Sequence, residues 1–507
     1  MPTTTLPETR VIRRTPVWLL IAVAGMMTIC IAAAILLAKW PFSRDKITRD
    51  LEDATQGSVS VQKFHSTFFP PGCVAENVSI SHSRVLNTPS PVSIERLVFR
   101  TSYSSLLKKH VAVVEARNVS AVIGVAGTTG SALPEATSSS GAIIDKFEII
   151  GGSIAVERRQ GTPPLLFQIR KAVFSTPGQH AAVPFEITVH NPEPPGDLSV
   201  KGSFGPWNHQ HALLTPIAGS YTFSRADLAN LGGIAGTLNS TGTFTGPIAQ
   251  LQIAGAITVS NFETKKAEHE LPLSVKFGAT VETRKDTVQF NHVTAQLEDS
   301  VIDSDGTIVS ANGSTRTAAD LAVPHGRIQD FLFLLLRQPR PPMTGAFTFR
   351  GKAALPSGNG SFEQRVQLTG DFGIDAGKFT NPKTQHNIET LSETAEGEPN
   401  DTPESVVSDL RGHVELKNGT FTLTRLSFHA PGGVAKLQGT YNLLTQSIDL
   451  HGKILTEAAL SHETTGFKSF LLKIIGPFLK KNHRGGAVIP VSITGIYPHA
   501  IYKTDPM

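Results

Sequence analysis

Residues 414–423, VELKNGTFTL, decide the fold. Asn418 and Gly419 stand between two runs of alternating polarity, which is the strongest short-range signal for a two-residue β-hairpin turn. Side chains alternate between the two faces of a strand, so the hairpin has one apolar face and one polar face. The turn sets four cross-strand pairs, two apolar and two polar: Val414 with Leu423, Leu416 with Phe421, Glu415 with Thr422, and Lys417 with Thr420.

The same alternation of apolar and polar residues recurs along most of the 507 residues. Glycines and prolines separate these runs, and the chain contains 44 glycines and 33 prolines. This pattern is typical of many short strands and turns. A Gly-x-Phe phrase recurs without a fixed period, and we interpret it as a strand that leaves a turn with its Phe on the buried face. The sequence therefore predicts a mostly β protein, an elongated and largely antiparallel sheet with a few short helices. Alternation alone leaves open whether the sheet closes on itself as a sandwich or barrel or curls into a groove.

Residues 17–38, VWLLIAVAGMMTICIAAAILLA, carry no charge. At about 1.5 Å per residue this run reaches roughly 33 Å, enough to cross a hydrocarbon core of about 30 Å. We interpret it as a transmembrane anchor, with a cleaved signal peptide as the alternative. The prediction places residues 1–16 in the cytoplasm and residues 42–507 outside it, on a single-pass membrane protein.

Three regions follow the predicted anchor. Residues 42–125 begin with a helix from Ser43 and a strand that carries Val59 and Val61. Residues 126–142, AGTTGSALPEATSSSGA, are small and polar and predict a linker. A β-rich middle region covers residues 143–370 and a C-terminal region residues 371–507.

Three helices are expected to interrupt the strands. Residues 327–336, RIQDFLFLLL, are very apolar but too short to span a membrane, so they predict a buried cap, with a plug or a lid on an apolar groove as the alternative. Residues 381–396 predict a polar helix. Residues 466–481 predict an amphipathic helix that either presents a solvated charged face or contacts a membrane surface through four lysines: Lys468, Lys473, Lys480 and Lys481.

Composition and motifs argue against an enzyme. The formal net charge of +4 gives no case for a nucleic-acid partner. Cys30 lies in the predicted anchor, so Cys73 has no partner for an intrachain disulfide. We expect Cys73 to be a small buried apolar residue. The segment with Asp303 and Asp305 lacks the third acidic position of a calcium loop, so we expect a turn there and not a metal site. The zinc-protease, nucleophile-elbow, dinucleotide and phosphate-loop motifs do not occur, and the histidines show no ligand spacing, so no catalytic residue, cofactor or metal is expected.

Both ends of the chain resemble the AsmA family of bacterial envelope proteins. At the N-terminal end the resemblance is carried by the anchor, RDKITRDLEDATQG, SVSVQKF, FFPPG, ENVSI and SIERLVFRTSYSSLLKKHVAVVEARNVSAVI. At the C-terminal end the resemblance is carried by DFGIDAGKFTNPKTQHNIETLSETAEG, by the strand-rich stretch from LRGHVELKNGTF to IDLHGKI, and by the final stretch FKSFLLKIIGPFLKKN…GGAVIPVSITGIYPHAIY. The two ends cover roughly 240 residues, and the specificity lies in the order of these phrases.

AsmA-like proteins are similar in part to bridge-like lipid-transfer proteins, whose curled sheets carry an apolar trough. The resemblance implies a single-pass protein of the inner membrane with the bulk of its chain in the periplasm, which binds or transfers phospholipid for outer-membrane homeostasis. Candidate lining residues are Val59, Val61, Val414, Leu416, Phe421 and Leu423, although a closed core would place the same residues inside. The alternatives are a scaffold for outer-membrane protein biogenesis with envelope protein partners, and a surface-polysaccharide enzyme, which would need paired carboxylates.

Overall fold

A computed structural model of the chain describes residues 40–55, 57–81, 91–108, 110–123, 143–157, 163–175, 182–208, 211–265, 267, 269–311, 314–337, 339–358, 360–380, 408–430, 433–456, 488–496, 499 and 501–503. The predicted anchor at 17–38, the linker at 126–142 and the helices at 381–396 and 466–481 lie outside the described residues. Among the described residues, no helix combines the length and the apolar character that crossing a membrane requires.

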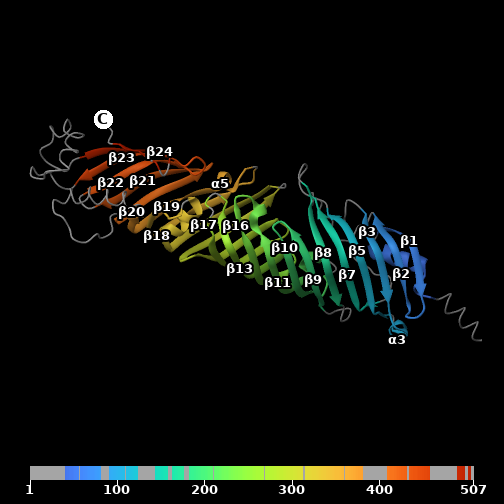
Figure 1. Ribbon diagram of the computed structural model, residues 1–507. Helices are drawn as coiled ribbons and strands as arrows, with labels where there is room; N and C mark the ends of the chain where they lie inside the picture. Colours follow the sequence, from blue (N-terminus) through green and yellow to red (C-terminus); the bar gives the residue numbers. More distant parts are fainter. Residues whose placement is uncertain are drawn as a thin grey trace, which may run out of the picture.

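The described part of the chain forms one sheet of 23 strands and a second sheet of two strands, which confirms the predicted mostly β, largely antiparallel fold. Each strand pairs with the next one along the chain, and the order of colours in Figure 1 follows the sheet from one end to the other. All pairs are antiparallel except β5 with β7, which are parallel and flank residues 124–142. Among the described residues β1 pairs only with β2 and β25 only with β24, so the sheet does not close on itself.

The strands of the sheet have the following bounds: β1 Ser58–Thr67, β2 Gly72–Ser81, β3 Val92–Arg100, β5 Val113–Ile123, β7 Lys146–Val156, β8 Leu165–Ser175, β9 Val183–Pro192, β10 Pro195–Phe204, β11 Pro216–Asp227, β12 Ile234–Pro247, β13 Gln250–Thr264, β14 Leu271–Glu282, β15 Thr287–Leu297, β16 Ser300–Ala311, β17 Ser314–Arg327, β18 Met343–Leu355, β19 Gln367–Phe379, β20 Ser408–Lys417, β21 Thr420–Ala430, β22 Gly433–Asn442, β23 Ser447–Thr456, β24 Val488–Ile496 and β25 Ile501–Lys503.

The helices are short and lie at the ends of strands. They are α2 Arg44–Thr55, α3 Tyr103–Leu107, α4 Ile328–Leu335 and α5 Phe362–Arg365, with 3-10 turns η1 Ala212–Leu214 and η2 Leu228–Leu231. Strands β4 His110–Val111 and β6 Ile143–Ile144 form a separate two-stranded parallel sheet. The helices predicted from Ser43 and over residues 327–336 are confirmed as α2 and α4.

The hairpin predicted around Asn418 and Gly419 is confirmed in its register. Strands β20 and β21 pair Leu416 with Phe421 and Glu415 with Thr422. Two other predictions are wrong. Asp303 and Asp305 lie within β16 and not in a turn, because valine, isoleucine and threonine around them favour a strand. The Gly-x-Phe phrase Gly360–Phe362, for which a strand is predicted, instead precedes and begins helix α5, since Ser361 forms a capping box with Gln364.

One apolar row crosses the sheet from β2 to β24. Cross-strand partners lie on the same face, so the pairings can be followed from strand to strand. We call the resulting set the apolar row: Cys73, Phe99, Val114, Phe147, Phe174, Phe185, Gly202, Gly219, Phe244, Ile253, Ala279, Phe290, Gly306, Ala319, Ala353, Leu368, Leu416, Phe421, Tyr441, Ile448 and Gly495. No member carries a charge, so one face of the sheet, the apolar face, is continuous over almost its whole length.

The opposite face is polar in the same register. One row on the adjacent positions of the C-terminal strands consists of Asp305, Asp320, Lys352, Thr369, Glu415, Thr422, Thr440, Asp449 and Thr494. A one-residue slip in any strand would exchange apolar and polar side chains between the faces. The rows therefore explain why the register is well determined over so many strands.

Bulges interrupt many of the strand pairs. Register shifts occur at residues with positive φ, among them Arg225 in β11, Asn261 in β13, His292 in β15 and Arg425 in β21. A bulge bends its strand and increases the local twist. Their repetition along the sheet provides a physical cause for a sheet that is bent across its strands.

Candidate functional site

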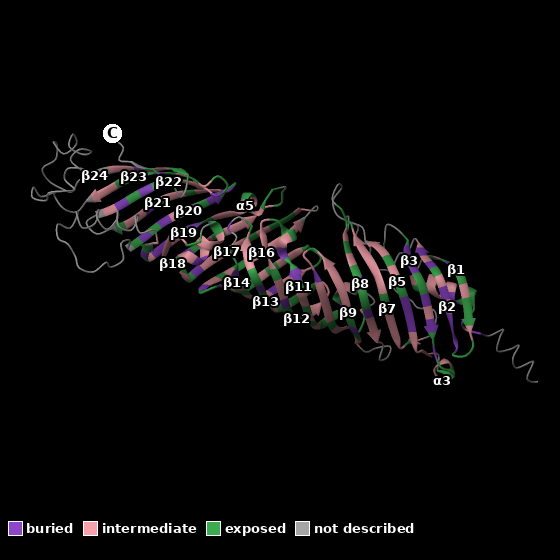
Figure 2. Cartoon of the chain, viewed as in Figure 1, coloured by how far each residue is buried: buried purple, intermediate pink, exposed green. Residues whose placement is uncertain are grey.

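The apolar face is the candidate site, because much of it is neither covered nor fully buried. Phe244, Ile253, Phe290, Ala319 and Ala353 are only half-buried. Figure 2 shows the same trend, with long buried stretches on β2 and β3 and mostly intermediate burial on β7 to β9. Extended apolar surface of this kind on a folded protein marks an interaction site.

Glycines on this face lie beneath aromatic rings of the same or the neighbouring strand. A Cβ on Gly219 would lie 2.7 Å from Phe244 Cζ, and one on Gly202 would lie 3.1 Å from Phe185 Cζ. Gly351 and Gly370 pair with each other, and both lie under the ring of Phe349. The predicted place of the Gly-x-Phe phrase, at the start of a strand after a turn, is wrong at Gly202–Phe204, which ends β10, and at Gly242–Phe244, which lies in the middle of β12. The glycines instead have a packing role: each leaves room for a ring, and the ring covers the backbone that the glycine exposes.

Two predicted lining residues lie in a closed core at the N-terminal end. Val61 is buried and Val59 is half-buried in a cluster that α2 covers through Ile47 and Leu51. Residues of α2 also occupy the free edge of β1, since Arg44 Nη2 donates to Val61 O at 2.6 Å and Val59 N donates to Glu52 Oε1 at 3.1 Å. The helix therefore blocks both the apolar face and the strand edge at this end.

The four predicted lining residues of the C-terminal hairpin lie together on the apolar face. Leu416 and Val414 are buried, whereas Phe421 and Leu423 are only partly buried. All except Leu416 belong to a cluster centred on Val323, Phe349 and Val414. Leu416 pairs directly with Phe421 and so lies on the same face.

Helix α4 packs onto the apolar face, as expected of a cap. Phe331 contacts Phe347 of β18 with ring centroids 4.9 Å apart. At the other end of the helix, Thr264 Oγ1 at the end of β13 donates to Leu334 O at 2.6 Å. Its polar attachment could not be predicted from the sequence: buried Ser300 donates to buried Asp330 at 2.7 Å and accepts from Arg327 N at 2.9 Å.

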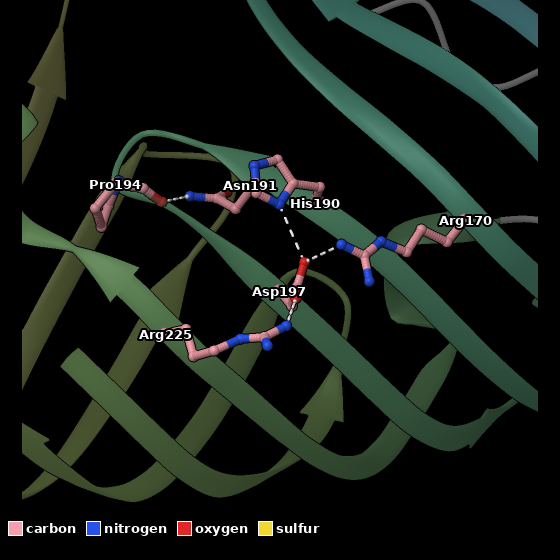
Figure 3. Close-up of polar contacts among 6 residues, drawn as sticks. All are labelled: Arg170, His190, Asn191, Pro194, Asp197 and Arg225. Atoms are coloured by element: carbon pink, nitrogen blue, oxygen red, sulfur yellow. Dashed lines mark hydrogen bonds and ion pairs between the residues drawn. The ribbon is translucent and has the colours of Figure 1, made fainter. Parts of the chain in front are cut away.

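The polar face carries an Asp–Arg–His cluster that local spacing does not predict (Figure 3). Asp197 of β10 accepts from Arg170 of β8 at 2.6 Å and from Arg225 of β11, and lies 3.0 Å from His190 Nδ1 of β9. The hydrogen bond with His190, then that with Arg225, holds the pKa of Asp197 below its usual range. In the same view Asn191 Nδ2 donates to Pro194 O at 2.8 Å and holds the β9–β10 turn.

A similar arrangement recurs near the other end. Asp371 of β19 lies 2.8 Å from His413 Nδ1 of β20 and accepts from Arg425 of β21 at 2.9 Å. The hydrogen bond with His413 lowers the pKa of Asp371. Both groups join side chains of neighbouring strands, so we interpret them as polar contacts that hold the strands together on the polar face.

A hollow of about 550 Å³ opens over strands β15 to β20. Its lining includes apolar-row members of all six strands, among them Phe290, Ala319 and Leu368, together with the residues on either side of them. Two of those neighbours, Asp320 and Lys352, form an ion pair at 2.7 Å. In the described part of the chain no group of three His, Cys, Asp or Glu side chains could hold a metal ion.

Cys73 is fully buried in the apolar row, as predicted, and is not disulfide-bonded. Burial raises the pKa of its thiol to about 12, which makes it a poor nucleophile. The candidate membrane-surface residues Lys468, Lys473, Lys480 and Lys481 lie outside the described residues.

Comparison with known proteins gives no assignment, since no family model and no curated protein sequence matches the chain.

Proposed function

We propose that this chain is a non-enzymatic, AsmA-like carrier that holds phospholipid acyl chains on the apolar face of its sheet and passes them between the inner and outer membranes. The observation that carries the proposal is the apolar row, which is continuous from β2 to β24 and half-buried over much of its length. The bulges would bend the sheet around this face into a trough, and α4 would cap part of it.

The energetics fit a carrier. Each buried CH₂ contributes about 0.8 kcal/mol, so a sixteen-carbon chain would be held by on the order of 10 kcal/mol before ordering costs. Because neighbouring positions along the row are chemically alike, sliding by one strand would change this free energy little. The polar headgroup would remain in water at the ends of the strands.

The length of the sheet also fits the proposal. Twenty-three strands at about 4.8 Å spacing extend over roughly 105 Å if the sheet is not strongly curled. In this proposal residues 17–38 anchor the β1 end in the inner membrane, and β24 and β25 lie toward the outer membrane. A partner at the far end would complete the path if the periplasm is wider than the sheet.

The experiment is mass spectrometry of phospholipid that co-purifies with the full chain, compared with a Leu416→Glu/Phe421→Glu variant. These two residues pair on the apolar face, so two buried carboxylates there would oppose an acyl chain. The matched control is Thr422→Glu, which adds a carboxylate to the same hairpin on the polar face. Circular dichroism identifies variants that retain the sheet.

We expect the folded double variant to lose bound phospholipid and the control to retain it. Equal phospholipid in all three proteins would contradict the proposal. A wild-type protein without phospholipid would favour a scaffold role, in which protein partners cover the apolar face.

A further inference from the structure

An exposed apolar patch lies at one corner of the sheet, where the described chain begins. We call Phe68, Phe69, Tyr103 and Leu107 the corner patch. Phe69 and Leu107 are 87% and 89% exposed, unusually high values for large apolar side chains, and Phe68 and Tyr103 are 37% and 40% exposed. Phe68 and Phe69 follow β1, and Tyr103 and Leu107 belong to α3, which projects from the end of the sheet in Figure 1.

The patch is held in a fixed arrangement. Tyr103 Oη donates to Phe68 O at 2.8 Å, and the rings of Tyr103 and Phe69 have centroids 5.7 Å apart. Helix α3 is capped by Ser102, which accepts from Ser105 N at 3.1 Å. Leu106 of α3 packs against the N-terminal core, so its neighbour Leu107 points outward. The exposed side chains therefore belong to well-supported elements.

The patch lies where the chain enters from residues 1–39. The ring of Trp40 contacts that of Phe68 with centroids 4.7 Å apart. Only Lys39 separates Trp40 from the uncharged run at 17–38, so a span in that run would leave the bilayer beside this corner. Phe, Tyr and Leu are residues that enter the headgroup region, and exposed Lys108 beside them can extend its ammonium to lipid phosphates.

We propose that the corner patch inserts into the surface of the bilayer that residues 17–38 would span in the proposed function, on which this inference rests, so that the β1 end of the sheet is seated on the membrane at two points. A single span alone would leave the sheet free to tilt about residue 39. A second contact through Phe69 and Leu107 fixes its orientation. This inference concerns membrane docking and does not require that the apolar face carries lipid.

The test uses the full chain with a Cys30→Ala background, in vesicles of phosphatidylcholine and phosphatidylglycerol. An environment-sensitive fluorophore is attached at Ser104→Cys beside the patch, and in a second protein at Thr445→Cys in the turn before β23, far along the sheet. Buried Cys73 is protected from the label. Lipids with a nitroxide on the acyl chain quench only fluorophores that lie at the bilayer.

We expect strong loss of emission at position 104 and none at position 445. Phe69→Ser/Leu107→Ser removes side chains that are almost fully exposed, so it should leave the circular dichroism spectrum unchanged and abolish the quenching at position 104. Equal quenching at positions 104 and 445, no quenching at position 104, or quenching that survives the double substitution would each overturn the proposal. Quenching by lipid carried on the apolar face would survive Phe69→Ser/Leu107→Ser, whereas quenching by insertion of the patch would not, so the double substitution distinguishes this outcome from that of the carrier test.

Discussion

Single side chains decide whether the faces of the sheet can pack. Glycine weakens a strand in isolation, yet here it allows an aromatic ring to lie flat across two strands. The pairing of Gly351 with Gly370 beneath Phe349 is the clearest instance. The recurrence of Gly-x-Phe was visible in the sequence, but the ring that covers each glycine was not, because ring and glycine often belong to different strands.

Gly351→Ala should destabilise the protein. A Cβ at this position would lie 2.7 Å from Phe349 Cζ and 2.1 Å from Thr369 O, so backbone or ring must move, at a cost of about 1–3 kcal/mol. Gly358→Ala is the control, because its Cβ would meet nothing nearer than Arg365 Cδ at 4.0 Å. Urea unfolding measures both, and equal midpoints would contradict the packing role.

Asp197 should contribute stability that depends on pH. Its pKa is lowered in the folded protein by His190 and Arg225. A depressed pKa gives stability that is fully present above the unfolded value, for which the ordinary 3.8 serves, and that is lost as the pH falls through the folded value. The stability difference between wild type and Asp197→Asn should therefore shrink in acid below about pH 4. Thermal unfolding from pH 7 to pH 3 tests this, and a constant difference would contradict it.

At the scale of elements, alternation and turn chemistry predicted the strands, the β20–β21 register and helices α2 and α4. They did not predict the parallel pairing of β5 with β7, because the intervening linker carries no pattern that selects a strand direction. They also missed that Val59 and Val61 lie under α2. A strand pattern shows that one face is buried without showing which element covers it.

Helix α4 should depend on its polar attachment at Ser300. Ser300→Ala leaves Asp330 buried without its donor and Arg327 N without its acceptor, which should cost about 1–3 kcal/mol. Hydrogen exchange over residues 328–335 should become faster. Ser310→Ala, which removes an exposed hydroxyl contact with Thr315, is the control. Unchanged exchange in Ser300→Ala would show that the apolar contacts alone hold the helix.

At the scale of the whole molecule, continuity of the apolar row is the property that matters, and it arises only when every strand keeps its register. The consecutive residues Ala318 and Ala319 lie on opposite faces near the middle of the row. If lipid moves along the face, Ala319→Glu should block its transfer between donor and acceptor membranes, whereas Ala318→Glu should not. Transfer of a labelled phospholipid measures this, and equal transfer by both variants would contradict movement along the row.

The most direct test of lipid on the apolar face is photo-crosslinking from single positions of the full chain in bacterial membranes. A photoreactive residue is placed at Ala319 or Ala353, members of the apolar row, and at their neighbours Ala318 or Ala354 on the polar face. The account predicts phospholipid adducts from Ala319 and Ala353 and none from Ala318 and Ala354. Adducts from all four positions, or from none while proteins are captured at Ala319 and Ala353, would contradict it.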